Sequence, residues 1–199
     1  MQATRTLPQG FDLLGSISLK QNRRLFMLLN ILGIPWLLAC AAFFFFMAGL
    51  LGALGSGSGS VTLDATTLLL SLVALVVTSA VVLVLHELAH GLFFWLFTRS
   101  RPRFGFKGAY AYAAAPGWYF PRPQFLIIGL APIVLISLAG LLVLPFTAPP
   151  VSLLFIVALI VNATGAIGDL YMIARLLVVP RGVLIEDHGE GIRWFAPAA

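Results

Sequence analysis

Charged side chains are scarce in this sequence. They make up 10% of its 199 residues, with only seven acidic residues, whereas hydrophobic residues make up 60% and the mean hydropathy is +1.03. Soluble domains carry roughly 25% charged residues. The composition therefore argues against an ordinary soluble domain and favours an integral membrane protein.

Cysteine is almost absent, since Cys40 is the single one. No disulfide can form within the chain, and cysteine usage does not indicate a redox compartment. Arg23 and Arg24 before an apolar run resemble the start of a signal peptide, but the run continues from 25 to 54, far beyond a signal core of ~7–15 residues. We therefore expect a retained transmembrane helix in which Cys40 is a packed apolar residue.

Four apolar segments are long enough to cross a bilayer, which takes about 17–25 helical residues. They cover approximately residues 25–54, 66–98, 124–146 and 151–178. No internal repeat and no soluble module is visible between them. The sequence thus predicts a single membrane-embedded domain over residues 1–199, an all-α polytopic membrane protein with about four transmembrane helices.

Positive charge is absent from two of the three loops between these segments. All 12 basic residues lie before the first segment, between the second and third, or at and beyond the end of the fourth. Positive residues flank the cytoplasmic ends of spans, so we expect a multi-pass protein of the cell membrane with both termini and the 99–123 loop in the cytoplasm. The net charge of +5 then reflects topology in a lipid bilayer, and nucleic-acid binding is not expected.

Two histidines and a glutamate lie within the second segment, in the sequence HELAH at 86–90. On a helix, residues four apart lie about 40° apart around the axis and one turn apart in height, so both imidazoles can reach one metal ion. Glu87 lies beside them, where it can act as a general base without being a ligand. The sequence therefore predicts one zinc ion on His86 and His90, with Glu87 as the catalytic base. Histidines that only hydrogen-bond between helices are the alternative.

A zinc site with two histidines needs a further protein ligand. Only Asp169 among the remaining acidic residues and the third histidine lies inside an apolar segment. The second and fourth segments run in the same direction, and Asp169 lies about as far from the cytoplasmic end as the two histidines, so we predict it as the third ligand. An aspartate satisfied by hydroxyl groups or water is the alternative. The candidates compared were Asp12, Asp64, Asp169, Glu186, Asp187, His188 and Glu190.

Polar residues and glycines interrupt the fourth segment around Asp169. Gly165 and Gly168 permit bending or close helix approach. Asn162 lies seven residues before Asp169, on nearly the same helix face but two turns away, too far to bind the same metal. We predict that its amide contacts a substrate carbonyl or a developing oxyanion, with polar contact between helices as the alternative.

Aromatic residues occur at even-numbered positions in the loop between the second and third segments: Phe104, Phe106, Tyr110 and Tyr112. This period of two predicts a strand, and Pro116-Gly117 predicts a turn into 118–121. We expect a small β-hairpin at the cytoplasmic membrane interface, whose edge could pair with an extended substrate. An aromatic belt without a substrate role is the alternative.

Two further local features have structural consequences. Pro132, inside the third segment, predicts a kink that frees the carbonyl of Ile128. The tail at 182–195 alternates around a glycine-rich turn and predicts a small cytoplasmic hairpin, with His188 as a solvated turn residue; a second metal site there is the less favoured reading.

The combination of motifs resembles the site-2 protease type of intramembrane zinc metalloprotease, and more closely the small bacterial "putative zincin peptidase" membrane family. The resemblance covers about residues 70–180 and rests on HELAH (86–90), PGWYFPRPQFLIIGLAP (116–132) and NATGAIGDL (162–170). It implies His86, His90 and Asp169 as zinc ligands and Glu87 as the general base. The chain departs from site-2 proteases at Leu170, where a glycine is typical.

These features favour a zinc-dependent intramembrane endopeptidase that acts on a membrane-protein substrate. The alternatives are a non-catalytic metal-binding membrane protein that serves as a scaffold or partner-binding module, and a metal transporter. Glu87 argues against the scaffold, because a purely structural site has no use for a base. The sequence does not indicate an oligomeric state.

Overall fold

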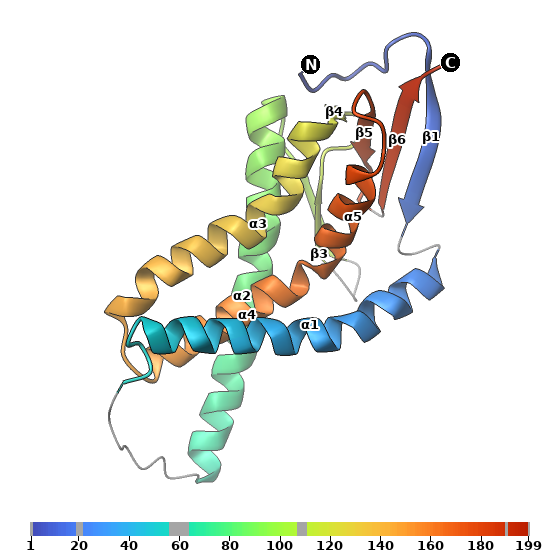
Figure 1. Cartoon of the computed structure of the whole chain (residues 1–199). Helices are drawn as coiled ribbons and strands as arrows, with labels where there is room; N and C mark the ends of the chain where they lie inside the picture. The colour runs from blue at the N-terminus through green and yellow to red at the C-terminus, as the bar shows by residue number, and fades with distance from the viewer. Residues whose placement is uncertain (1, 19–21, 56–63, 107–110, 190, 199) are drawn as a thin grey trace.

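The computed structural model of the chain describes residues 2–18, 22–55, 64–106, 111–189 and 191–198. A body of helices carries a small sheet at one end, and both termini lie near that sheet (Figure 1). The helices are α1 (Arg23–Leu50), α2 (Ala65–Thr98), α3 (Arg122–Val143), which continues into a 3-10 turn (Leu144–Phe146), α4 (Val151–Gly165) and α5 (Ile167–Leu177).

Local sequence signals explain where the two longest helices begin and end. The side chain of Asn22 accepts the N–H of Leu25 at the start of α1, and the carboxylate of Asp64 accepts the N–H of Thr67 at the start of α2. Helix α2 ends at Thr98 because Arg99 adopts a left-handed backbone conformation with φ of 52°.

The helices only partly match the four predicted spans. Three of them, α1, α2 and α3 with its 3-10 turn, are long and apolar enough to cross a membrane. The predicted fourth span is two helices, α4 and α5, which meet at an angle of 41° beside Gly165. Counting this bent pair as one span gives up to four. The segment expected as one span over 151–178 is therefore broken, at the place where Gly165 and Gly168 were expected to permit bending.

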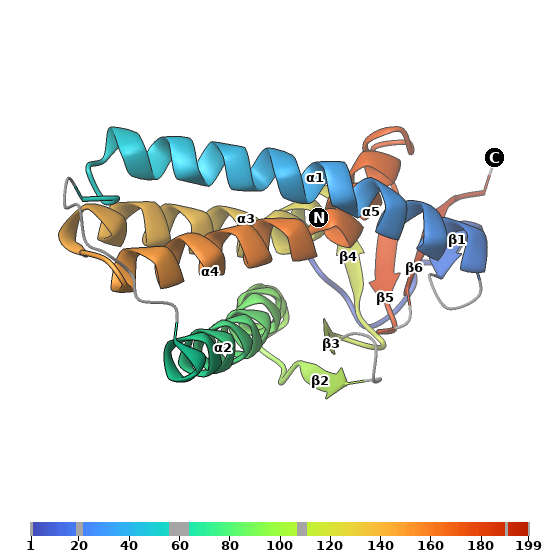
Figure 2. The same ribbon diagram turned by 90° about the horizontal axis from the view of Figure 1, so that it is seen from below.

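Close helix packing builds the end of the body that lies away from the sheet. In Figure 2, α1, α3 and α4 run side by side, whereas α2 is seen nearly along its axis. A Cβ atom on Gly140 of α3 would lie 2.5 Å from the side chain of Leu159 on α4, so this approach requires glycine. Cys40 is buried in the same apolar cluster, as expected.

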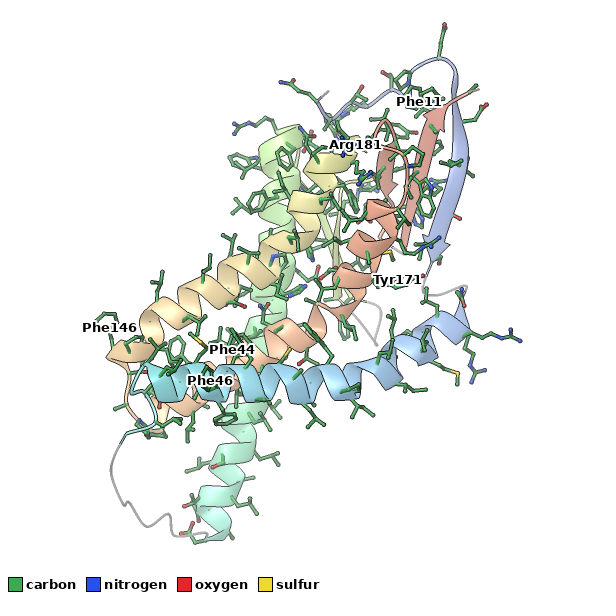
Figure 3. All side chains as sticks on the ribbon, viewed as in Figure 1. Phe11, Phe44, Phe46, Phe146, Tyr171 and Arg181 are labelled. Carbon is green, nitrogen blue, oxygen red and sulfur yellow. The ribbon has the colours of Figure 1, made fainter. Side chains whose placement is uncertain are left out.

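Large hydrophobic side chains cover the outside of the helices. Phe44 is buried with 3% of its surface exposed, whereas Phe46 on the same helix is 64% exposed and Phe146 is 89% exposed (Figure 3). Similar exposed leucines and valines follow α2 from Leu68 to Leu85. Apolar surface of this extent is unusual for a soluble monomer and is compatible with a membrane protein.

The sheet is larger than the sequence predicts, so the fold is mostly helical but not all-α. Four antiparallel strands pair in the order β1 (Phe11–Ser18), β6 (Gly191–Pro197), β5 (Leu184–Asp187) and β4 (Tyr119–Pro121). The tail hairpin predicted over 182–195 is confirmed as β5 and β6. Strand β1 was not predicted, and its pairing with β6 joins the two ends of the chain.

A separate hairpin lies between α2 and α3, with boundaries that correct the predicted strand. Strand β2 (Arg103–Phe106) pairs with β3 (Ala111–Ala114), so the chain reverses before Tyr112 instead of at Pro116-Gly117. Phe104 on β2 therefore lies opposite Ala113 on β3. Tyr112 is also on β3, so the two aromatic residues do not share a strand. Residues 118–121, expected to pair back onto this strand, contribute β4 to the other sheet.

Candidate metal centre

Helix α2 presents the two histidines of the HELAH sequence on one face. His86 and His90 are each 8% exposed, and their ring centroids lie 5.0 Å apart in an edge-on arrangement. One helical turn separates them, so the helix itself sets this distance. Glu87 is partly exposed and lies beside the pair.

Asp169 reaches the same point from the first turn of α5. Its Oδ2 lies 3.0 Å from Nε2 of His86 and 3.4 Å from Nε2 of His90. The bend between α4 and α5 lies three residues before it. The ligand atoms of the three side chains lie within 4.8 Å of one another, and no other group of three His, Cys, Asp or Glu residues in the described parts of the chain has this geometry.

A second layer of contacts orients both imidazoles. Nδ1 of His86 lies 3.0 Å from Oδ1 of Asn162, and Nδ1 of His90 lies 2.9 Å from the carbonyl oxygen of Ile128. Both partners are acceptors, so each Nδ1 is assigned as a donor, and Nε2 of each ring faces Asp169. The carbonyl of Ile128 is the one that Pro132 was predicted to free from helical bonding.

This donor arrangement fits a metal ion. Two imidazole nitrogens and one carboxylate oxygen converge on one point, and each of these atom types is a ligand that zinc prefers. Ligands at about 2.0 Å from a tetrahedral zinc ion are ~3.3 Å apart, close to the two separations from Asp169. His86, His90 and Asp169 would hold the ion and leave its remaining position to water or substrate.

A cavity of about 170 Å³ opens beside the cluster. Glu87, His90 and Asp169 line it on the helical side, and residues of β3 and of the β5–β6 connection line it on the other. The backbone of Ala113 on β3 interacts with the Glu87 carboxylate. Glu87 thus lies next to the predicted ligands and at the edge of a space that a substrate group can enter.

Sequence comparison agrees with this geometry. Residues 79–184, more than half of the chain, match the family described as "Putative zincin peptidase". The chain belongs to this family. The zincin family implies zinc as the metal and suggests a zinc-dependent peptidase, and the matched residues include the HELAH sequence and Asp169. No curated protein and no solved structure matches the chain.

The other predicted site residues of this zincin-family chain lie in different surroundings. Asn162 is 1% exposed, and its Nδ2 donates to the carbonyl of Pro132 at 3.2 Å, so both ends of its amide contact protein. These contacts favour orientation of His86 over the predicted oxyanion contact, which remains a prediction.

The predicted substrate-binding aromatics have separate positions. Phe104 packs on α2 at Gly91, where a Cβ atom would lie 2.4 Å from its ring. Phe106 is 68% exposed. Tyr112 lines the cavity, and Tyr110 lies outside the described residues.

Asp187 is a residue of the cavity that the sequence analysis missed. The sequence placed it among the candidate third ligands but outside the apolar segments, and the structure shows that it lines the cavity together with His90 and Asp169. Burial raises the pKa of its carboxyl to about 7, and the nearby Asp169 and Glu87 carboxylates add to the rise. Strand alternation gives no signal for this placement, because residues on both faces of β5, such as Leu184 and Ile185, are buried.

We expect an Asn162→Ala variant to bind zinc about 10- to 100-fold more weakly, because His86 Nδ1 loses the acceptor that orients its ring. The matched control is Asn30→Ala on the exposed face of α1, which should leave the affinity unchanged. Competition with a chromogenic chelator measures both. Unchanged zinc affinity with a lower kcat would instead favour the oxyanion role of Asn162.

Proposed function

We propose that this zincin-family chain is a zinc-dependent intramembrane endopeptidase of the site-2 protease type, which hydrolyses peptide bonds within or next to transmembrane segments. The observation that carries the proposal is the group formed by the buried His86 and His90 with the partly buried Asp169, with Glu87 beside it at a cavity. A carboxylate in that position, adjacent to the ligands but outside them, suits a base rather than a structural contact.

Each residue has a defined task in the proposed reaction. His86, His90 and Asp169 bind the ion, and Asn162 and the Ile128 carbonyl hold the imidazoles in orientation. Zinc, when bound, supplies Lewis acidity that activates water and polarises a carbonyl. Glu87 takes the proton of the water that adds to the scissile carbonyl carbon. As the C–N bond breaks, Glu87 returns that proton to the leaving amine nitrogen.

We further propose a multi-pass protein of the cell membrane with both termini in the cytoplasm. The pairing of β1 with β6 supports this topology, because strands of one sheet lie on the same side of a membrane and require an even number of crossings between them. Strand β4, between α2 and α3, belongs to the same sheet. The bent pair α4 and α5 then counts as the fourth span, and the basic residues place the sheet in the cytoplasm.

A substrate must be locally extended to expose a peptide bond to Glu87. Strand β3 pairs with β2 alone among the described strands, and Ala111, Tyr112 and Ala113 line the cavity. We propose that an extended substrate adds along β3, as predicted for this hairpin from the sequence.

The test compares membranes from cells that produce the wild-type chain, the Glu87→Gln variant or the Glu186→Gln variant. Glu186 is the matched control, because its side chain pairs with Arg193 across the sheet and does not line the cavity. We expect quantitative proteomics to find fragments of transmembrane proteins with the wild type and with Glu186→Gln but not with Glu87→Gln. Zinc binding without such fragments would favour the non-catalytic scaffold, and zinc flux through liposomes would favour the transporter.

A further inference from the structure

The cavity beside the metal cluster contains a carboxylate that the proposed hydrolysis does not use. Asp187, the last residue of β5, lines the cavity together with Glu87 and Asp169. Its Oδ1 accepts the N–H of Gly189 at 2.7 Å. Within the described part of the chain, no donor is bonded to its Oδ2. As far as the described residues go, one carboxylate oxygen therefore faces no donor and can bind a group that enters the cavity.

Gly189, two residues after Asp187, and Gly191, the first residue of β6, pack closely against other strands. A Cβ atom on Gly189, where φ is +79°, would lie 2.6 Å from the ring of Tyr112 on β3. A Cβ atom on Gly191 would lie 2.0 Å from the carbonyl oxygen of Ile17 on β1. Because Tyr112 packs on Gly189 and Ile17 packs on Gly191, Asp187 lies next to closely packed backbone.

The cavity has an excess of negative charge. Of the described residues that line it, Glu87, Asp169 and Asp187 are acidic, and none is Lys or Arg. Burial makes the charged form of the Asp187 carboxylate unfavourable, and the neighbouring Asp169 and Glu87 carboxylates add to this cost. A cationic group beside Asp187 would compensate the excess.

The volume of the cavity and the metal-binding side chains around it limit which cationic group can bind beside Asp187. A volume of about 170 Å³ is well below the roughly 300 Å³ at which pockets hold drug-sized ligands, so the space suits a single side chain. A second metal ion is disfavoured, because in the described residues Asp187 belongs to no group of three metal-binding side chains.

We propose that Asp187 determines substrate specificity by binding the ammonium or guanidinium group of a Lys or Arg side chain next to the scissile bond. The inference rests on the proposed peptidase function. It matches the proposed topology, because transmembrane proteins concentrate Lys and Arg at the cytoplasmic ends of their spans. Asp187 lies beyond residues 79–184, so the family match does not include it.

A binding experiment tests the inference without catalysis. It uses the full chain with Glu87→Gln, purified in detergent with zinc, and fluorescent transmembrane peptides with acetylated and amidated ends. The peptides differ at one position near the cytoplasmic end, which carries Lys, norleucine or Glu. We expect the Lys peptide to bind about tenfold more tightly than the norleucine peptide.

Substitution of Asp187 should remove this preference. Asp187→Asn retains an oxygen that can accept from Gly189, so the zinc content should persist while the Lys and norleucine peptides bind equally. Asp187→Lys should shift the preference to the Glu peptide. Asp12→Asn on β1, at an exposed position outside the cavity, is the matched control and should keep the Lys preference.

Cleavage by the wild-type chain separates this inference from the proposed function. A kcat/KM about tenfold higher for the Lys peptide, caused by a lower KM, would support the role of Asp187. Equal kcat/KM for all peptides, or a preference that survives Asp187→Asn, would overturn it and leave the peptidase function in place. If no peptide is cleaved, the proposed peptidase function is wrong. The binding preference for the Lys peptide then tests the role of Asp187 independently of cleavage.

Discussion

A Glu87→Gln variant should bind zinc as the wild type does and hydrolyse peptides about 100- to 10,000-fold more slowly. Glutamine preserves the size of the side chain but cannot take the proton of the attacking water. Glu87 is not among the three residues whose ligand atoms converge, so the ion should stay bound. The loss should therefore appear in kcat, measured with a quenched fluorescent transmembrane peptide in detergent at saturating zinc.

Two controls define the result for Glu87. Glu186→Gln makes the same chemical change at a residue that does not line the cavity, and it should keep full activity. Zinc content, measured by atomic absorption, separates loss of the base from loss of the metal. A Glu87→Gln variant with full zinc and more than a tenth of the wild-type rate would exclude Glu87 as the general base.

An Asp169→Asn variant should lose at least ~100-fold in zinc affinity, because it removes the only charged ligand of the predicted set. In the metal-free chain the substitution should be tolerated, since an amide N–H of asparagine can donate to an Nε2 lone pair of His86 or His90. Zinc at 1,000 times its Kd should stabilise the wild type by about 4 kcal/mol. The same zinc concentration should stabilise the variant far less, which thermal unfolding in detergent can measure.

Asp187→Asn is the control for this experiment, because it changes a carboxylate of the same cavity outside the ligand set. Its stabilisation by zinc should resemble that of the wild type. If Asp169→Asn retained the zinc-dependent shift, Asp169 would not be a ligand, and the third ligand would have to come from elsewhere in the chain.

Much of the metal cluster follows from helix geometry and bilayer depth. The spacing of His86 and His90 places them on one face of any helix that contains them. Asp169 was selected because it lies inside an apolar segment, and the structure brings its Oδ2 to 3.0 Å from His86. The spacing of the histidines and the depth of Asp169 both follow from regular helix geometry, in which the residue number gives the position along and around the axis.

The parts that sequence analysis missed depend on pairing between distant strands. Strand β1 pairs with β6 across almost the whole chain, and β4 pairs with β5, although 118–121 was expected to pair with its neighbour. Period-two alternation indicates a strand but does not indicate its partner. The same limitation hid Asp187, whose exposure depends on which elements cover β5.

The sequence by itself determined an apolar chain with two histidines on one helix face in HELAH and a single carboxylate at the matching depth, because helix periodicity and the cost of charge in lipid are local properties. The glycines near Asp169 permit a bend, which the structure shows as 41° between α4 and α5. Tertiary structure alone decided the use of Asn162 and the Ile128 carbonyl to orient the imidazoles, and the presence of Asp187 in the cavity. Each of these depends on contacts between residues far apart in the chain, and local patterns carry no information about which distant segments pack together.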